Sequence, residues 1–165
     1  MQTITPEILT KESFAAYGEV LELAGSKPVT INSGNCDRYH DLATIDVCDS
    51  GSAGISLFDA KVYANPLTLR YVERHPLGSQ AFLPTSTDPY LIVVADDHNN
   101  KAQIPKAFIT NGYQGVNYFR NCWHGVLTPI IKKSIFVVVD YIGDEQNLQE
   151  YSYDQPYLID FSANI

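Results

Sequence analysis

Three polar side chains in a mostly apolar segment are the first candidates for chemistry in this sequence. The segment YVERHPLGSQAFLP, residues 71–84, has Glu73 and His75 two positions apart, and Gln80 follows after a short turn. Because side chains alternate between the two faces of a strand, Glu73 and His75 point to the same side. Burying a charge alone is costly, so this pair on an inner face would need a cation, a metal ion or each other.

Two further groups of polar residues could complete such a site. One lies in GVNYFRNCWHGVL and comprises Asn117, Arg120, Asn121, Trp123 and His124. The other lies in INSGNCDRYHDLA and comprises Asn32, Asp37, Arg38, His40 and Asp41. An arginine suits a carboxylate ligand because its guanidinium group binds two oxygens at once. The residues together indicate a mixed nitrogen and oxygen site.

The same residues also have plainer interpretations. Glu73 and His75 could form an exposed polar edge, although that arrangement would turn Val72 and Arg74 inward. His124 follows a tryptophan and could be a hydrogen-bonded core histidine. No catalytic triad order, phosphate-binding loop or dinucleotide fingerprint competes with the polar groups. Spacing alone therefore predicts a small β-barrel in which a mixed site is one of several options.

The rest of the chain predicts strands that would position these residues. YLIVVADD and SIFVVVDYI are continuous β-branched runs, as expected for strands covered on both faces. Turn-forming segments such as PLGS, TSTDP, DDHNNK and TNGYQG separate the runs. Many short strands without crossover helices indicate an antiparallel sandwich or barrel. Only TKESFAAYGEV is predicted to be helical, with Thr10 as its N-cap and Gly18 past its end.

Composition narrows the class of protein. A chain of 165 residues with 45% hydrophobic residues is expected to form one globular domain over residues 1–165. The net charge of −8 argues against nucleic acid or an anionic membrane surface as a partner. The N-terminus shows no secretory signal and no apolar run is long enough to span a bilayer. Three cysteines without framework spacing favour a reducing, cytoplasmic setting.

The motifs in combination resemble the ureidoglycolate lyase family, a branch of the cupin β-barrels. The resemblance covers about Phe14 to Asp140 and is carried by FAAYGEV, RYHDL, VERHPLGSQAFLP and FITNGYQGVNYFRNCWH, in that order. It implies an all-β chain: a cupin-type antiparallel β-barrel or jelly roll with one or two short helices, assembled as a homodimer. The implied activity is cleavage of ureidoglycolate to glyoxylate and urea in allantoin and purine degradation.

The cupin resemblance also implies a metal site. The first cupin motif has the form HxH, three or four residues, then Glu, and here it resembles Glu73-x-His75 followed by Gln80. The histidine of the second cupin motif matches His124. The implied ligands are therefore Glu73, His75, Gln80 and His124. Nickel is the metal that the family implies, the donor set leaves manganese or zinc open, and no organic cofactor is expected.

Roles can be assigned as hypotheses within this resemblance. The catalytic residues are expected to be Glu73, His75 and His124. The expected substrate-binding residues are Asn32, Arg38, His40, Gln80, Asn117 and Arg120. Among these, Arg38 or Arg120 would receive the carboxylate if no metal is bound, the two asparagines would bond the urea group, and His40 would be a reserve proton carrier.

The chain departs from the family pattern at two positions. Family members commonly have NYHR and WHH in the second motif, where this sequence has Phe119 and Gly125. Both positions lie an odd number of residues from His124, which predicts that they face away from it on a regular strand. If they do not, the alternative is a cupin-fold enzyme or sensor for another small hydroxy or keto acid.

Overall fold

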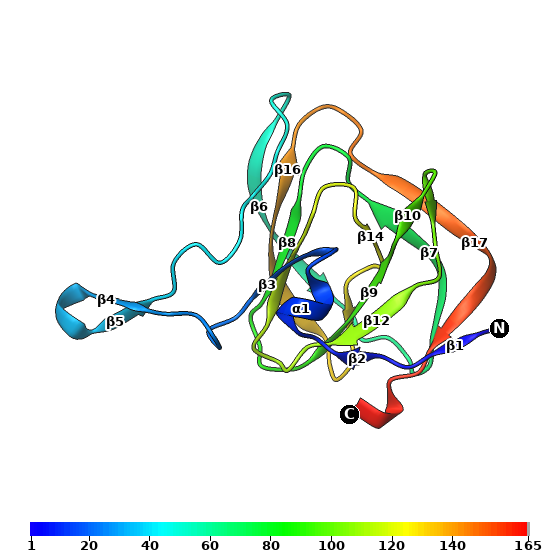
Figure 1. The fold of residues 1–165 in the computed structure, drawn as a ribbon, viewed down its shortest axis with the longest axis horizontal. Coiled ribbons are helices and arrows are strands. Elements are labelled where there is room, and N and C mark those ends of the chain that lie inside the picture. The colour runs from blue at the N-terminus through cyan, green and yellow to red at the C-terminus, as the bar shows by residue number, and fades with distance from the viewer. Residues whose placement is uncertain (165) are drawn as a thin grey trace.

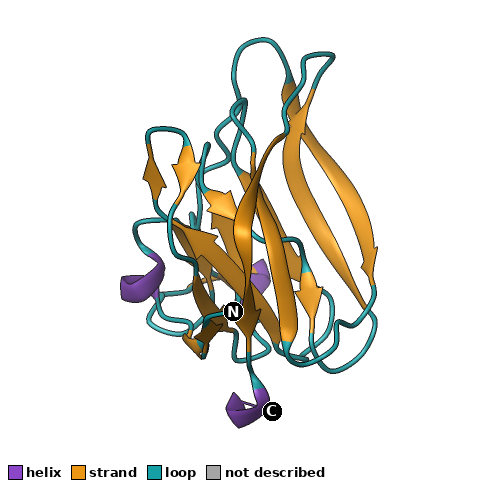
Figure 2. Cartoon of the chain, turned by 90° about the vertical axis from the view of Figure 1, so that its right-hand side faces the viewer, coloured by secondary structure: helices purple, strands orange, loops and turns teal. Residues whose placement is uncertain are grey.

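The computed structural model describes residues 1–164, and it consists of strands with only short helical segments (Figures 1 and 2). The strands of the larger sheet are Thr3–Ile4 (β1), Glu7–Ile8 (β2), Leu67–Arg74 (β7), Tyr90–Ala95 (β9), Lys106–Ile109 (β12), Trp123–His124 (β14), Thr128–Pro129 (β15) and Gln149–Ile159 (β17). They lie in the order β1-β17-β7-β14-β9-β12-β2, with β15 paired to β9. The all-β prediction is confirmed.

The second sheet faces the first across the core. Its strands are Gly18–Leu21 (β3), Ser52–Ala60 (β6), Gln80–Pro84 (β8), Gly115–Tyr118 (β13) and Ser134–Ile142 (β16). Their order is β3-β13-β8-β16-β6, and every pairing in this sheet is antiparallel. Two small hairpins complete the strands: Val29–Ile31 (β4) with Cys36–Arg38 (β5), and Asp97–His98 (β10) with Lys101–Ala102 (β11). The two curled sheets fit the cupin-type barrel.

Alternation along β9 separates two apolar clusters. Tyr90, Ile92 and Val94 belong to a cluster that also contains Phe82 of β8 and Val138 of β16, so this cluster fills the space between the sheets. Leu91, Val93 and Ala95 belong to a second cluster, on the other side of the larger sheet. We call the first side the inner face and the second the outer face. A run buried on both sides explains why YLIVVA is continuously apolar.

The helix predicted over TKESFAAYGEV is much shorter in the structure. Helix α1 spans Lys11–Phe14, and Thr10 is its N-cap, in a capping box with Ser13. Gly18 opens β3 instead of following a long helix, because its backbone lies directly against the Asn117 carbonyl, where a side chain would clash. Strand pairing therefore overrides the helical pattern here. The remaining helical segments are 3-10 turns at Asn32–Gly34 (η1) and Ser162–Asn164 (η2). None of the helices in the described chain is long and apolar enough to cross a membrane.

Candidate functional site

A carboxylate and two imidazoles meet on the inner face of the larger sheet. Glu73 of β7 lies directly opposite His124 of β14 in the antiparallel register, and His75 follows the end of β7. The potential ligand atoms of the three residues all lie within 4.8 Å of one another. His124 is paired with Val94, a member of the inner cluster, whereas Trp123 belongs to the outer cluster. The group is compatible with a divalent cation.

Hydrogen bonds fix which nitrogen of each histidine faces the centre of this group. The Nδ1 atom of His75 lies 2.7 Å from the Asn147 carbonyl oxygen, and that of His124 lies 3.0 Å from the Gly125 carbonyl oxygen. A carbonyl only accepts, so each Nδ1 carries a proton, and in the neutral imidazole Nε2 keeps a lone pair. Both Nε2 atoms are buried without a hydrogen-bond partner among the described residues. Metal-binding histidines are commonly oriented in this way.

Burial sets the charge of the group. It raises the pKa of Glu73, an effect that the nearby His75 partly opposes. It lowers the pKa of His124 to about 3, with a further lowering from the charge that His75 can carry. The ring of Tyr118 stacks on His124 with 4.3 Å between centroids and 10° between planes. His124 is therefore a rigid, neutral imidazole near pH 7, the form that a metal ion needs.

Gln80 presents an oxygen from the opposite sheet. It is buried at the start of β8, across from Tyr118 in the register of β13. Its Nε2 atom donates to Oδ2 of Asp140 over 3.1 Å, while its Oε1 atom is buried without a partner. Because a carboxylate only accepts, Asp140 fixes the amide with its nitrogen toward β16 and its oxygen turned away. An amide oxygen without a protein partner is a suitable ligand for a metal ion or a substrate N–H.

Two residues that contribute to this arrangement were not found from the sequence. Asp140 ends the apolar run SIFVVVDYI two positions after Val138, hence on the inner face, and that alternation is the signal that would have identified it. Asn147 accepts from His75 through its carbonyl and from the Leu77 N–H through its side chain, over 2.7 Å in each case. Its main contribution is a backbone carbonyl, which no residue type reveals.

The structure does not bring Asn117 and Arg120 to the group. Asn117 lies on the outward side of β13, where its Nδ2 atom donates to Glu19 Oε2 over 2.8 Å and to the Thr44 carbonyl over 2.9 Å. Arg120 forms a two-point ion pair with Asp46, with distances of 2.9 and 2.6 Å. Both side chains hold neighbouring segments of the chain together.

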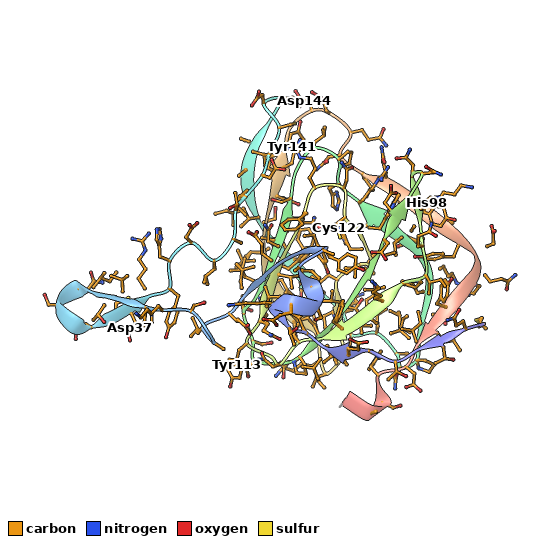
Figure 3. The ribbon with its side chains drawn as sticks, in the orientation of Figure 1. Asp37, His98, Tyr113, Cys122, Tyr141 and Asp144 are labelled. Atoms are coloured by element: carbon orange, nitrogen blue, oxygen red, sulfur yellow. The ribbon has the colours of Figure 1, made fainter. Side chains whose placement is uncertain are left out.

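Asn32, Arg38 and His40 lie still farther away. The hairpin of β4 and β5 projects from the body of the molecule, as Figure 1 shows, and Figure 3 labels Asp37 on it. All three side chains are exposed. The contact found for Arg38 is within the same segment, 2.9 Å from its Nη2 to Nδ1 of His40. Within one chain, these residues do not reach the group around Glu73.

The two departures from the family pattern face away from His124. The Phe119 side chain is 43% exposed. A side chain at Gly125 would meet Val93 and Leu69, which belong to the outer cluster. For Gly125, directly after β14, the placement matches the alternation along the strand, whereas Phe119 is separated from β14 by a turn in which the Cys122 N–H donates to the Phe119 carbonyl, so alternation does not apply to it. Having Phe119 and Gly125 at these two positions therefore removes no polar side chain from the inner face.

Comparisons with known proteins identify the family of this chain. Residues 1–160 match the family model described as Ureidoglycolate lyase. The chain is similar to the ureidoglycolate lyase of Rhodobacter capsulatus, 48% identical over 160 residues that cover 97% of this chain and 99% of the relative. It is also similar to that of Chelativorans sp., 45% identical over 160 residues covering 96% and 97%. The protein of the same name from Brucella melitensis biotype 2 is 44% identical over 162 residues covering 97% and 96%.

Proposed function

The chain belongs to the ureidoglycolate lyase family, and from this premise we propose that it cleaves ureidoglycolate to glyoxylate and urea. The observation that carries the proposal is the inner-face group, in which a carboxylate lies beside two imidazoles whose buried Nε2 atoms have no hydrogen-bond partner among the described residues. A substrate with a carboxylate, a hydroxyl group and a urea group offers partners for each of these atoms. Phe119 and Gly125, the residues that favoured another substrate, lie off the inner face.

We further propose that His75, Gln80 and His124 hold a divalent cation in this group. Two imidazole nitrogens with an amide oxygen suit a borderline ion, and nickel is the one that the family resemblance implies, with manganese and zinc as the other options. The orphaned Nε2 and Oε1 atoms fit such an ion. When bound, the ion would polarise the oxygens of the α-hydroxy carboxylate and lower the pKa of its hydroxyl group.

Glu73 is proposed as the residue that moves the proton. Its raised pKa suits a base that takes the hydroxyl proton of the substrate. As the C=O bond of glyoxylate forms, the C–N bond breaks and its electron pair goes to the departing urea nitrogen. Protonated Glu73 then returns the proton to that nitrogen, so that proton and charge balance. His124 stays neutral, and both histidines orient the reacting oxygens from positions fixed by their Nδ1 hydrogen bonds.

The cellular location, the pathway and the assembly of the protein are part of the same proposal. A cytoplasmic location is supported by the free cysteines Cys36, Cys48 and Cys122. A place in allantoin and purine degradation and a homodimeric state follow from the family resemblance. A direct role in substrate binding is proposed only for residues of the inner-face group, since the others lie elsewhere in the chain.

The decisive experiment is an assay of glyoxylate release from racemic ureidoglycolate. The protein would be assayed as purified, after EDTA treatment, and after addition of nickel or manganese. We expect release well above the spontaneous rate, lost with chelator and restored by metal. Release that ignores the chelator would remove the metal from the proposal. Absence of release with every metal would remove the lyase activity itself.

A further inference from the structure

Strand β7 is irregular just before Glu73. Leu69 and Val72 both belong to the outer cluster, although residues three apart on a regular strand face opposite sides. The pairing of β7 with β17 shifts at the same place, between the partners of Leu69 and Tyr71. Irregularities of this kind re-aim side chains and are frequent beside active sites. We call Arg70 and Tyr71, the two residues at this irregularity, the β7 bulge.

The β7 bulge lies close to the inner-face group. Both of its side chains are exposed and outside the outer cluster, whereas the residues before and after them belong to that cluster. Burial of part of the ring raises the pKa of Tyr71, and the charges of Glu73 and Glu150 raise it further. The phenol is therefore within electrostatic reach of Glu73, the proposed base.

The larger sheet is open beside the β7 bulge. Strand β14 pairs with β7, but the following strand β15 pairs with β9 alone (Figure 1). A cavity of about 120 Å³ lies between β7 and residues 125–128, and both residues of the β7 bulge line it together with Tyr63. Gly125 helps to keep the cavity open, because a Cβ there would lie 3.1 Å from Val93. The space suits a small acid and excludes a peptide.

Arg70 is the arginine whose side chain forms no ion pair or hydrogen bond with another residue of the described chain. The other three arginines, Arg38, Arg74 and Arg120, each contact a neighbouring side chain. A guanidinium group presents a planar fork of donors that matches the two oxygens of a carboxylate. At an exposed position on the wall of a small cavity, the fork of Arg70 is free for such a ligand.

The surrounding charges favour a cation at this position. Ureidoglycolate is an anion, and Glu150 lies directly opposite Glu73 in the register of β7 and β17. These two carboxylates and the net charge of −8 repel an anionic substrate. The other cation of β7, Arg74, is engaged with three side chains on the outer face. Arg70 lies three residues before Glu73, about 10 Å along the strand, a span that a long side chain and a small substrate together bridge.

We propose that Arg70, assisted by the Tyr71 hydroxyl group, binds the carboxylate of the substrate at the rim of this cavity. The inference rests on the proposed lyase function and adds a substrate-binding residue that the sequence motifs did not single out. With the carboxylate held at the β7 bulge, the hydroxyl group of the same molecule is directed along β7 toward Glu73. Arg70 moves no proton, so it acts on the binding of the substrate and not on the chemical step.

Titration calorimetry with oxalurate tests the proposal without turnover. Oxalurate has the carboxylate and the urea group of the substrate but a keto group in place of the hydroxyl group, so Glu73 has no hydroxyl proton to remove. Arg70→Gln should weaken oxalurate binding by about 10- to 100-fold, as expected for the loss of a hydrogen-bonded charge. Tyr71→Phe should weaken it by about 2- to 10-fold. Arg70→Lys keeps the charge and should restore part of the affinity.

The neutral amide of oxalurate separates carboxylate recognition from an effect on shape. It should bind wild-type protein and Arg70→Gln equally, and an equal loss of affinity for both probes would overturn the proposal. The matched control is Lys101→Gln, which removes the same charge at an exposed position on β11 and should bind oxalurate as wild type does. A loss for Lys101→Gln as large as for Arg70→Gln would reduce the effect to net charge and would also overturn it. Thermal melting would verify that each variant is folded.

Steady-state kinetics keeps the failure of this inference apart from the failure of the lyase function. In Arg70→Gln, KM for ureidoglycolate should rise by about 10- to 100-fold while kcat stays within about threefold of wild type. An unchanged KM with an unchanged oxalurate affinity would overturn the inference and leave the lyase function standing. Wild-type protein that releases no glyoxylate but binds oxalurate through Arg70 would remove the lyase function and support the carboxylate site.

Discussion

Neighbouring residues on β7 and β14 face two different environments. On the outer face, the Arg74 guanidinium lies 4.2 Å above the Trp123 ring, and Asp97 accepts from both side chains. On the inner face, one residue away on each strand, Glu73 lies opposite His124. The outer pair and the inner pair occupy the same region of the sheet and differ only in which side they face.

The two pairs differ in how far the protein satisfies their polar atoms. Arg74 donates from its three nitrogens, to Gln149, Asp97 and Asn100, over 2.8 to 3.3 Å. His124 uses Nδ1 for a backbone carbonyl and leaves Nε2 buried without a partner in the described chain. Because an unpaired buried polar atom costs free energy, such an atom needs a compensating role. The outer pair is therefore satisfied within the fold, whereas the inner pair leaves an atom free for the ligand that we propose.

Replacement of Glu73 should have the largest effect. Glu73→Gln keeps the shape of the side chain but removes the base, so turnover of ureidoglycolate should fall by about 10²- to 10⁴-fold with the fold retained. Nickel or manganese affinity, measured by titration calorimetry, should stay near wild type. The matched control is Glu12→Gln, at an exposed position on α1, which should keep full activity. Near-normal turnover would remove Glu73 from the mechanism, and loss of metal binding would make it a ligand instead of the base.

Replacement of Asp140 should have an intermediate effect through Gln80. In Asp140→Asn the Gln80 amide no longer has a carboxylate that fixes its orientation, so metal affinity and turnover should fall by roughly 10- to 100-fold. The rescue variant combines Gln80→Glu with Asp140→Asn, which reverses the donor and the acceptor and again turns an oxygen away from β16. Metal affinity of the double variant should exceed that of either single variant. Equal affinities would show that Asp140 does not position Gln80.

The residues of the inner pair could be predicted from the sequence, whereas the residues that orient them could not. Alternation along β7 places Glu73 and His75 on one side, and the family resemblance adds His124; the structure brings these three residues together. Sequence reasoning did not separate them from Arg38 or Asn117, because the same residue types occur in all three motifs. Only the tertiary placement shows that Asn117 donates to Glu19 and Thr44, and that Arg38 stands on a projecting arm. The short helix α1 was overestimated because strand pairing at Gly18 is a long-range effect.

Replacement of Arg74 should affect stability and leave chemistry intact. Arg74→Met keeps an unbranched side chain against Trp123 but removes the charge, so Gln149 and Asn100 lose the Arg74 donor and Asp97 keeps only its bond from Trp123. The free energy of unfolding should fall by about 2 kcal/mol, as for other charged hydrogen-bonded groups that are largely buried. Urea denaturation would measure the loss, while turnover at 25 °C should stay within about twofold of wild type. A large loss of turnover in folded protein would contradict the division between the two faces.

Replacement of Arg120 should have the smallest effect. Its ion pair with Asp46 has good two-point geometry, but both side chains are partly exposed, so water and salt screen the charges. Arg120→Ala should lower the free energy of unfolding by less than about 1 kcal/mol, and the loss should shrink further in high salt. Because the guanidinium group is engaged with Asp46, KM for ureidoglycolate should not change. A rise in KM for Arg120→Ala that Asp46→Ala does not reproduce would show instead that Arg120 leaves Asp46 to receive the substrate carboxylate, and the inner-face group would then extend to the loop between β13 and β14.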